Sequence, residues 1–138
     1  MDFKKLANQY RDELLDNVLP FWLEHSQDGE YGGYFSCLDR EGKVFDTDKF
    51  IWLQGREVWM FSMLYNKVEK RQEWLDCAVQ GGEFLKKYGH DGNYNWYFSL
   101  DRSGRPLVEP YNIFSYTFAT MAFGQLSLAT GNQEYADI

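Results

Sequence analysis

Two stretches of this sequence repeat each other, and the repeat limits the possible folds more than any other feature. YFSCLDREGK at residues 34–43 matches YFSLDRSGR at residues 97–105 when one residue is skipped. At an offset of 62 residues, the aligned pairs are Asp39 with Asp101, Arg40 with Arg102, Gly42 with Gly104, Ile51 with Ile113, Phe61 with Phe123, and Leu64 with Leu126. A period of this length is typical of a repeated helical hairpin.

The hydrophobic pattern predicts two kinds of helix. Apolar residues recur every three or four positions over residues 3–18 and 73–88, which indicates amphipathic helices at the outside of the fold. Residues 48–68 and 111–130 are apolar on nearly every side, so we expect them to be inner helices. Outer and inner helices therefore alternate along the chain.

Local signals predict where these helices begin and end. We expect Pro20 to end or kink the first helix, and Asp46, Thr47 or Asp48 to cap the second. Gly89 is a plausible end for the third helix, and DREGK at residues 39–43 is predicted to be a hairpin turn.

The predicted fold is all-α and consists of helical hairpins with small β-hairpin loops before the inner helices. Residues 1–138 form a single partial domain, with repeats at about 1–68 and 69–131. GNQEYADI at residues 131–138 resembles the start of a third repeat, so we expect a truncated chain. A closed ring of six such hairpins would need roughly 370 residues. Two hairpins leave their inner faces exposed, which predicts a homodimer or other self-association.

Composition excludes several classes of protein. The formal net charge of −7 argues against binding to nucleic acid or to an anionic membrane surface. Cys37 and Cys77 form no metal-binding or C-x-x-C motif, which favours a reducing compartment. The N-terminus is too charged for a signal peptide, and no run is long and apolar enough to span a bilayer. We therefore expect a soluble, cytoplasmic protein.

The second helix carries an arginine among aromatic residues. In helical register, Trp52, Arg56, Trp59 and Met63 share one face. One interpretation is a cavity wall, where indoles stack on sugar C–H surfaces and the guanidinium binds a carbonyl or oxyanion. The alternative is a structural ion pair between helices. Similarly, Tyr111, Ser115 and Tyr116 could bind a polar ligand or satisfy backbone carbonyls.

Other candidates for chemistry are weaker. His25 and His90 lie in or beside loops, where a histidine can act as a general base but is more often simply solvated. The carboxylates Asp28, Glu30, Asp39 and Asp101 could supply the acid and base of a glycosidase. Asp39 and Asp101 occupy repeated turn positions, which favours a role in the turns. No metal, nucleotide or phosphate-loop motif is present in the sequence.

Residues 25–66, HSQDGEYGGYFSCLDREGKVFDTDKFIWLQGREVWMFSMLYN, and residues 107–132, LVEPYNIFSYTFATMAFGQLSLATGN, closely resemble the N-terminal part of the N-acylglucosamine 2-epimerase family. The resemblance implies the first third of an (α/α)6 barrel. It also implies isomerase activity without a cofactor, interconverting N-acetylglucosamine and N-acetylmannosamine, or cellobiose, mannose or sulfoquinovose in other members. In such enzymes a histidine removes the C2 proton of the opened sugar, and a second histidine returns a proton to the opposite face.

The resemblance also implies roles for particular residues. Arg56 of the WLQGR motif would be catalytic by stabilising the developing oxyanion, and Trp52, Gln54, Tyr111 and Ser115 would bind the sugar. The family's acid/base histidines fall beyond residue 138, so we expect this chain to be inactive alone. Two alternatives stay open: a non-catalytic helical module that binds carbohydrate or protein, and an α/α-barrel hydrolase or lyase with carboxylate catalysts.

Overall fold

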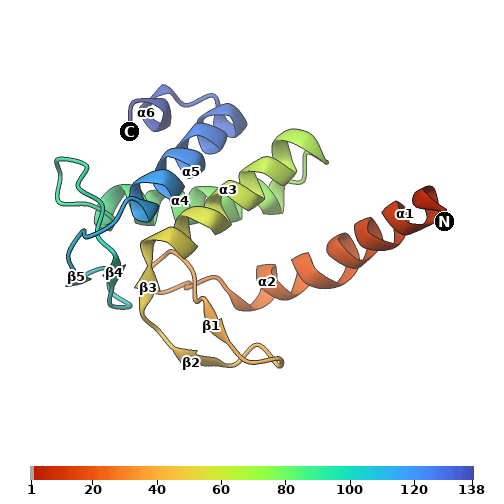
Figure 1. Cartoon of the computed structure of the whole chain (residues 1–138), viewed down its shortest axis with the longest axis horizontal. Coiled ribbons are helices and arrows are strands. Elements are labelled where there is room, and N and C mark those ends of the chain that lie inside the picture. The colour runs from red at the N-terminus through yellow and green to blue at the C-terminus, as the bar shows by residue number, and fades with distance from the viewer. Residues whose placement is uncertain (1) are drawn as a thin grey trace.

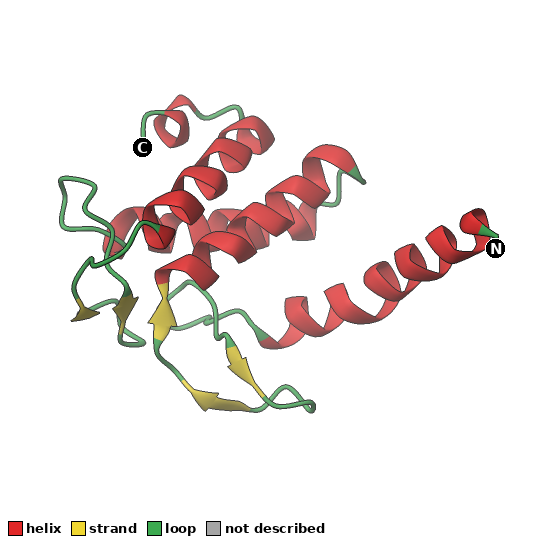
Figure 2. Ribbon diagram, viewed as in Figure 1, coloured by secondary structure: helices red, strands yellow, loops and turns green. Residues whose placement is uncertain are grey.

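The computed structural model describes residues 2–138. Its helices are α1 (Phe3–Glu13), α2 (Leu19–His25), α3 (Ile51–Lys67), α4 (Gln72–Tyr88), α5 (Phe114–Thr130) and α6 (Gln133–Ala136), with a π-helical segment at Leu14–Val18. Its short strands are β1 (Cys37–Leu38), β2 (Val44–Asp46), β3 (Lys49–Phe50), β4 (Ser99–Leu100) and β5 (Pro106–Val108). Figure 2 shows that the strands lie in the loops at one end of the helices.

The body of the fold consists of three long helices. α3 and α5 run side by side in the same direction, and α4 returns behind them (Figure 1). The core between them is formed by Ile51, Val58, Phe61 and Leu64 of α3, Trp74, Ala78 and Leu85 of α4, and Ala119, Phe123 and Leu126 of α5. Two parallel inner helices with an outer helix behind them agree with the predicted alternation.

The repeated sequence forms the same turn twice. The amide of Asp39 donates to the carbonyl of Lys43, and that of Asp101 donates to the carbonyl of Arg105. Gly42 and Gly104 occupy the matching positions with φ of +83° and +94°, a conformation that side chains with a Cβ rarely adopt. The first turn joins β1 to β2, as predicted for residues 39–43, and the second joins β4 to β5. The shared Asp and Gly are therefore explained by turn geometry.

Several predicted helix ends are wrong. Pro20 does not end the helical run, which continues to His25, although the regular helix is interrupted just before it by the π-helical segment Leu14–Val18. The wider π-helical turn at Leu14–Val18 makes room for the proline ring, which would clash with a carbonyl of a regular helix. The predicted helices 48–68 and 111–130 begin later, at Ile51 and Phe114.

The capping residues of α3 also differ from the prediction. Lys49 and Phe50 pair with β4 instead of joining the helix, and no side chain caps α3. The amide of Ile51 donates to the carbonyl of Phe98, 3.0 Å away, so a backbone group from the second loop replaces the expected cap. Two other predictions agree with the structure. The predicted third helix is α4, which ends before Gly89, and the short helix expected after Gly131 is α6, which begins at Gln133.

The N-terminal helices form an arm that projects from the body (Figure 1). No residue of α1 is buried, and its apolar stripe of Phe3, Leu6 and Tyr10 is exposed. The arm joins the core at its C-terminal end, where Leu19 is buried. Thus α1 does not pack along α3 in the way that α4 does. None of the helices in residues 2–138 combines the length and apolarity needed to cross a bilayer.

Candidate functional site

The WLQGR motif lies in the first two turns of α3, and its side chains face different surroundings. Trp52 is half-buried, Gln54 and Gly55 are buried, and Arg56 is exposed. Because Trp52 and Arg56 are four residues apart, they lie on the same face of the helix. The motif therefore presents one aromatic ring and one cation on a shared surface while its middle residues face the protein.

An aromatic pocket of about 300 Å³ lies beside Arg56. It is lined by Trp52, Phe98, Phe114 and Phe118, which come from α3, α5 and the residue before β4. The rings of Trp52 and Phe118 are 6.0 Å apart between centroids. The Cζ atom of Arg56 lies 6.0 Å from the Trp52 ring centroid and 5.9 Å from that of Phe118. These distances suit cation–π attraction, which holds the guanidinium at the edge of the pocket.

The guanidinium of Arg56 has no carboxylate partner within residues 2–138. This part of the chain therefore does not provide the structural ion pair that was the alternative interpretation. An exposed arginine without an ion pair retains its five N–H donors for an oxygen-rich ligand.

Gln54 does not line the aromatic pocket and is hydrogen-bonded within the protein. Its Oε1 accepts from the amide of Tyr34 at 2.8 Å, and its Nε2 donates to the carbonyl of Tyr34 at 2.8 Å. Gln54 is fully buried, so this carboxamide pairs with the backbone of the first loop instead of facing a ligand. Burial of an amide is costly unless it is hydrogen-bonded, and here both ends are satisfied.

The two predicted residues near α5 are placed differently from each other. Ser115 is buried, so its side chain is not exposed at the pocket. Tyr111 is exposed and precedes the helix, and its ring centroid lies 4.8 Å from that of Phe98. Phe98 thus connects Tyr111 to the pocket that contains Trp52. The structure brings Trp52, Arg56 and Tyr111 to one region and leaves Gln54 and Ser115 inside.

Two buried charged residues on or beside α3 are absent from the predicted site. Lys49 is completely buried, and its ammonium donates to Asp28, 2.9 Å away. Glu57 is buried too, and burial raises its pKa to about 8. The sequence holds one signal for Glu57, an acid within a helix that is apolar all round. It holds no comparable signal for Lys49, which follows a run of polar residues typical of a surface loop.

The carboxylates considered for hydrolysis are all engaged in structural contacts. Burial alone would raise the pKa of Asp28, but hydrogen bonds from Arg102 and Lys49 hold it well below its usual range. Glu30 pairs with Arg102 at 3.0 Å. Hydrogen bonds from the Arg105 amide and other turn groups hold the pKa of Asp101 well below its usual range. A carboxyl that stays ionised cannot act as a general acid, so these contacts do not favour a glycosidase.

The two histidines are likewise placed at loop ends. The ring of His25 packs on Phe21, with centroids 4.9 Å apart, and lies against the turn at Gly42. Nδ1 of His90 accepts a hydrogen bond from the amide of Gly92 at 3.0 Å. These contacts explain both residues as parts of the loop structure. Among residues 2–138, no three His, Cys, Asp or Glu side chains converge as a metal site would require.

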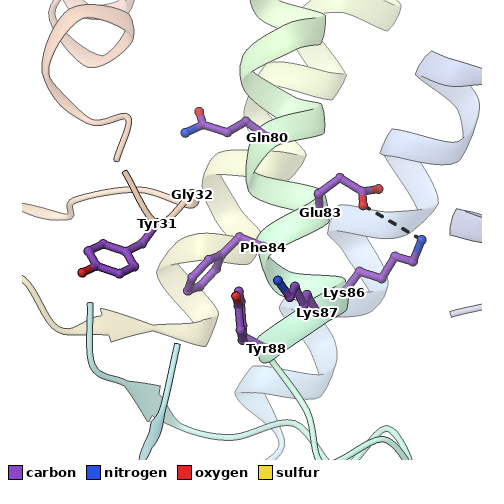
Figure 3. A pocket seen from close by; sticks show the side chains of 8 residues that line it. All are labelled: Tyr31, Gly32, Gln80, Glu83, Phe84, Lys86, Lys87 and Tyr88. Atoms are coloured by element: carbon purple, nitrogen blue, oxygen red, sulfur yellow. Dashed lines mark ion pairs between the residues drawn. The ribbon is translucent and has the colours of Figure 1, made fainter. Parts of the chain in front are cut away.

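A separate hollow of about 530 Å³ lies between α4 and the loop after α2 (Figure 3). Tyr31, Phe84 and Tyr88 line it together with Gln80, Glu83 and two lysines. Lys86 pairs with Glu134 at 2.6 Å, and Nε2 of Gln80 donates to the carbonyl of Asp28 at 3.1 Å, whereas the buried Oε1 of Gln80 has no hydrogen-bond partner within residues 2–138. This hollow does not include Trp52 or Arg56 and is not part of the candidate site.

A family model described as N-acylglucosamine 2-epimerase (GlcNAc 2-epimerase) matches residues 33–138. The N-acylglucosamine 2-epimerases of Mus musculus and Homo sapiens are both 47% identical to this chain, over 90% and 88% of its length. The matches cover 30% of the mouse protein and 29% of the human protein, so the chain spans less than a third of these relatives.

A solved structure of cellobiose 2-epimerase from Bacillus thermoamylovorans B4167 superposes on this chain with a TM-score of 0.88 and 30% identity. The match covers 97% of this chain and 34% of that one. This likeness confirms the predicted fold class, helical hairpins of an (α/α)6 barrel with small β-hairpin loops before the inner helices.

Proposed function

Because the chain belongs to the N-acylglucosamine 2-epimerase family, we propose that it supplies the oxyanion-binding part of a sugar 2-epimerase. The observation that carries this proposal is the exposed guanidinium of Arg56, without an ion pair in residues 2–138, at the edge of the aromatic pocket. Epimerisation at C2 passes through an enediolate, whose negative oxygen is best stabilised by a donor that is already in place. Arg56 is such a donor.

The proposed substrate pair is N-acetylglucosamine and N-acetylmannosamine. Its first support is the higher identity to the mouse and human N-acylglucosamine 2-epimerases than to the cellobiose 2-epimerase of Ruminococcus albus, which is 30% identical. Its second support is the pocket beside Arg56, where four aromatic rings form the lining. Such a lining suits the methyl of an N-acetyl group better than a sugar hydroxyl, because a buried hydroxyl needs a hydrogen-bond partner. An epimerase of cellobiose or mannose is the runner-up.

The proton transfers are assigned to residues outside this chain. Arg56 would hold the oxygen at the reacting end, Trp52 would pack on the sugar, and Tyr111 would border the pocket. Gln54 and Ser115 are not assigned to the sugar, because both are buried in the protein. We expect residues 1–138 alone to bind sugar weakly and not to epimerise it.

The organisation of the chain leads to two related proposals. We infer that the two repeats, residues 1–68 and 69–131, are successive hairpins of the ring. The exposed face of α5 includes Phe114, Met121 and Leu128, and contiguous apolar surface of this kind favours association. We therefore propose self-association of the chain through this face. The free thiols of Cys37 and Cys77 support a reducing, cytoplasmic location.

The test uses a chimera in which this chain replaces the matching segment of the mouse protein. The chimera is incubated with N-acetylglucosamine in heavy water, and NMR follows deuterium at C2. We expect incorporation together with N-acetylmannosamine, and loss of both in the Arg56→Ala chimera at unchanged helical content. A folded chimera without C2 deuterium, alongside an active mouse control, would overturn the proposal.

A further inference from the structure

Lys49 is a completely buried lysine whose three ammonium protons each have an acceptor. Nζ lies 2.9 Å from Oδ2 of Asp28, 2.6 Å from the carbonyl of Gly32 and 2.9 Å from the carbonyl of Arg102. The acceptors come from the loop after α2 and from the turn between β4 and β5. A single side chain thus joins the loop after α2 to the turn between β4 and β5.

The buried charge of Lys49 is balanced at Asp28. This carboxylate also accepts two hydrogen bonds from Arg102, at 3.0 Å from Nε to Oδ2 and 3.0 Å from Nη2 to Oδ1. The amides of Glu30 and Tyr31 donate to its Oδ1 at 3.1 Å and 3.2 Å. A buried ion pair costs desolvation unless such additional bonds satisfy it. Two cations therefore hold one carboxylate, but they belong to different elements.

The position of Lys49 along the chain separates it from Arg102. Lys49 lies in β3, opposite Leu100 of β4, and β3 continues directly into α3. Two residues later, the amide of Ile51 donates to the carbonyl of Phe98. The next residue is Trp52, and Trp52 and Phe98 are two of the four rings of the pocket. The backbone of this short segment therefore connects the start of α3 to β4 and Phe98, while the Lys49 side chain anchors the same segment to the loop after α2 and to the turn after β4.

We propose that Lys49 is a positioning residue for the pocket: its three hydrogen bonds fix the start of α3, so that Trp52 and Phe98 line one pocket and Arg56 lies at its edge. The effect of Lys49 on sugar binding rests on the proposed function. The effect of Lys49 on the placement of Trp52 does not depend on any ligand. The side chain of Arg102 neutralises the same carboxylate but does not belong to β3 or α3, and only its backbone carbonyl meets Lys49, so the side chain does not share this role. The two residues form a matched pair for a test.

The experiment compares Lys49→Met with Arg102→Met in the complete 138-residue chain, without sugar. Each variant removes one cation from Asp28 and leaves the other. Indole ¹H–¹⁵N NMR signals are recorded at a temperature where circular dichroism shows both variants folded, and Trp52→Phe assigns the Trp52 signal. We expect Lys49→Met to shift the Trp52 signal, while the signal of Trp74 in the core stays in place. Arg102→Met should lower the thermal midpoint but leave the Trp52 signal in place.

Two results would overturn the proposal: an unmoved Trp52 signal in Lys49→Met, or equal Trp52 shifts in the two variants. If Lys49→Met does not fold, the neutral pair Asp28→Asn/Lys49→Gln takes its place with the same readout and the same criteria.

A titration with N-acetylglucosamine then follows, and we expect affinity to fall roughly tenfold or more in Lys49→Met, since small misplacements are costly. Unchanged affinity alongside a shifted Trp52 signal would also count against the positioning role. Failure of the unaltered chain to bind the sugar would contradict the proposed function and leave the NMR comparison standing.

Discussion

Gly55 of α3 faces the backbone of Phe118 of α5 with no space for a side chain. A Cβ at Gly55 would lie 2.9 Å from the carbonyl carbon and 2.9 Å from the carbonyl oxygen of Phe118. Backbone atoms of a packed helix cannot swing aside as the end of a flexible side chain can. The glycine of the WLQGR motif therefore allows the two inner helices to approach closely, and this approach brings the Phe118 ring to Arg56.

Gly55→Ala is predicted to destabilise the fold despite the better helix propensity of alanine. Overpacking of this kind costs about 1–3 kcal/mol, which outweighs a propensity gain of roughly 1 kcal/mol. Urea unfolding followed by circular dichroism measures the change. Gly124→Ala on α5 is the control, because nothing lies within 4 Å of its Cβ position; it should stabilise the protein. A Gly55→Ala variant as stable as Gly124→Ala would contradict the close contact.

Arg56→Lys is predicted to lose sugar affinity without losing stability. Lysine keeps the charge but lacks the planar fork that can hold two oxygens, and a lost charged hydrogen bond is worth about 1.5–3 kcal/mol. Affinity for N-acetylglucosamine, measured by ligand-observed NMR, should fall on the order of tenfold or more. Thermal unfolding should not change, because Arg56 forms no ion pair within residues 2–138. A lower thermal midpoint with normal affinity would assign Arg56 a structural role.

The sequence predicts those parts of the fold that depend on local pattern. The repeat, the outer and inner helices and the shared Asp and Gly of the turns follow from periodicity and turn chemistry within a few residues. The start of α3 could not be predicted in this way. Lys49 and Phe50 form a strand because β4, about fifty residues later in the chain, lies beside them. Long-range pairing of this kind overrides local helix signals.

The same dependence on long-range contacts explains why only part of the candidate site was predicted from the sequence. The spacing of Trp52 and Arg56 places them on one face of a helix, and the structure agrees. Gln54 belongs to the same motif and was expected to bind the sugar, but its partner is the backbone of Tyr34. A glutamine that binds a loop and one that binds a ligand look alike in sequence. The distinction depends on which segment folds over the residue.

Gln54→Ala is predicted to weaken the fold and not the affinity of the folded protein. The substitution leaves the buried amide and carbonyl of Tyr34 without partners, at a cost of about 1–3 kcal/mol for each group. Urea unfolding measures the loss, and hydrogen exchange at the Tyr34 amide should accelerate. Sugar affinity that falls at unchanged stability would instead support the original substrate-binding prediction.

The carboxyl of Glu57 is predicted to hold a proton at neutral pH because it is buried, and its contact with Ser26 is compatible with this neutral form. Oγ of Ser26 lies 2.6 Å from the carbonyl of Trp22 and 2.5 Å from Oε1 of Glu57. A hydroxyl has a single proton, so when it donates to the carbonyl, a neutral Glu57 can donate to the hydroxyl oxygen. Burial favours the same form and raises the pKa of Glu57 from 4.5 to about 8.

Stability should therefore decrease as the pH rises from about 4.5 to about 8, the window between the usual and the folded pKa of Glu57. The contribution of Glu57 is fully present below this window, falls by roughly 1.4 kcal/mol per pH unit within it, and is lost above it. Glu57→Gln keeps a neutral donor toward Ser26, so it should remove this slope and be more stable than the unaltered protein at pH 8. Urea unfolding at pH 5, 6.5 and 8 measures both proteins. If stability changed with pH in parallel in the unaltered protein and in Glu57→Gln, Glu57 would be ionised in the folded state. The Ser26 hydroxyl would then donate the hydrogen bond that joins it to the Glu57 carboxylate.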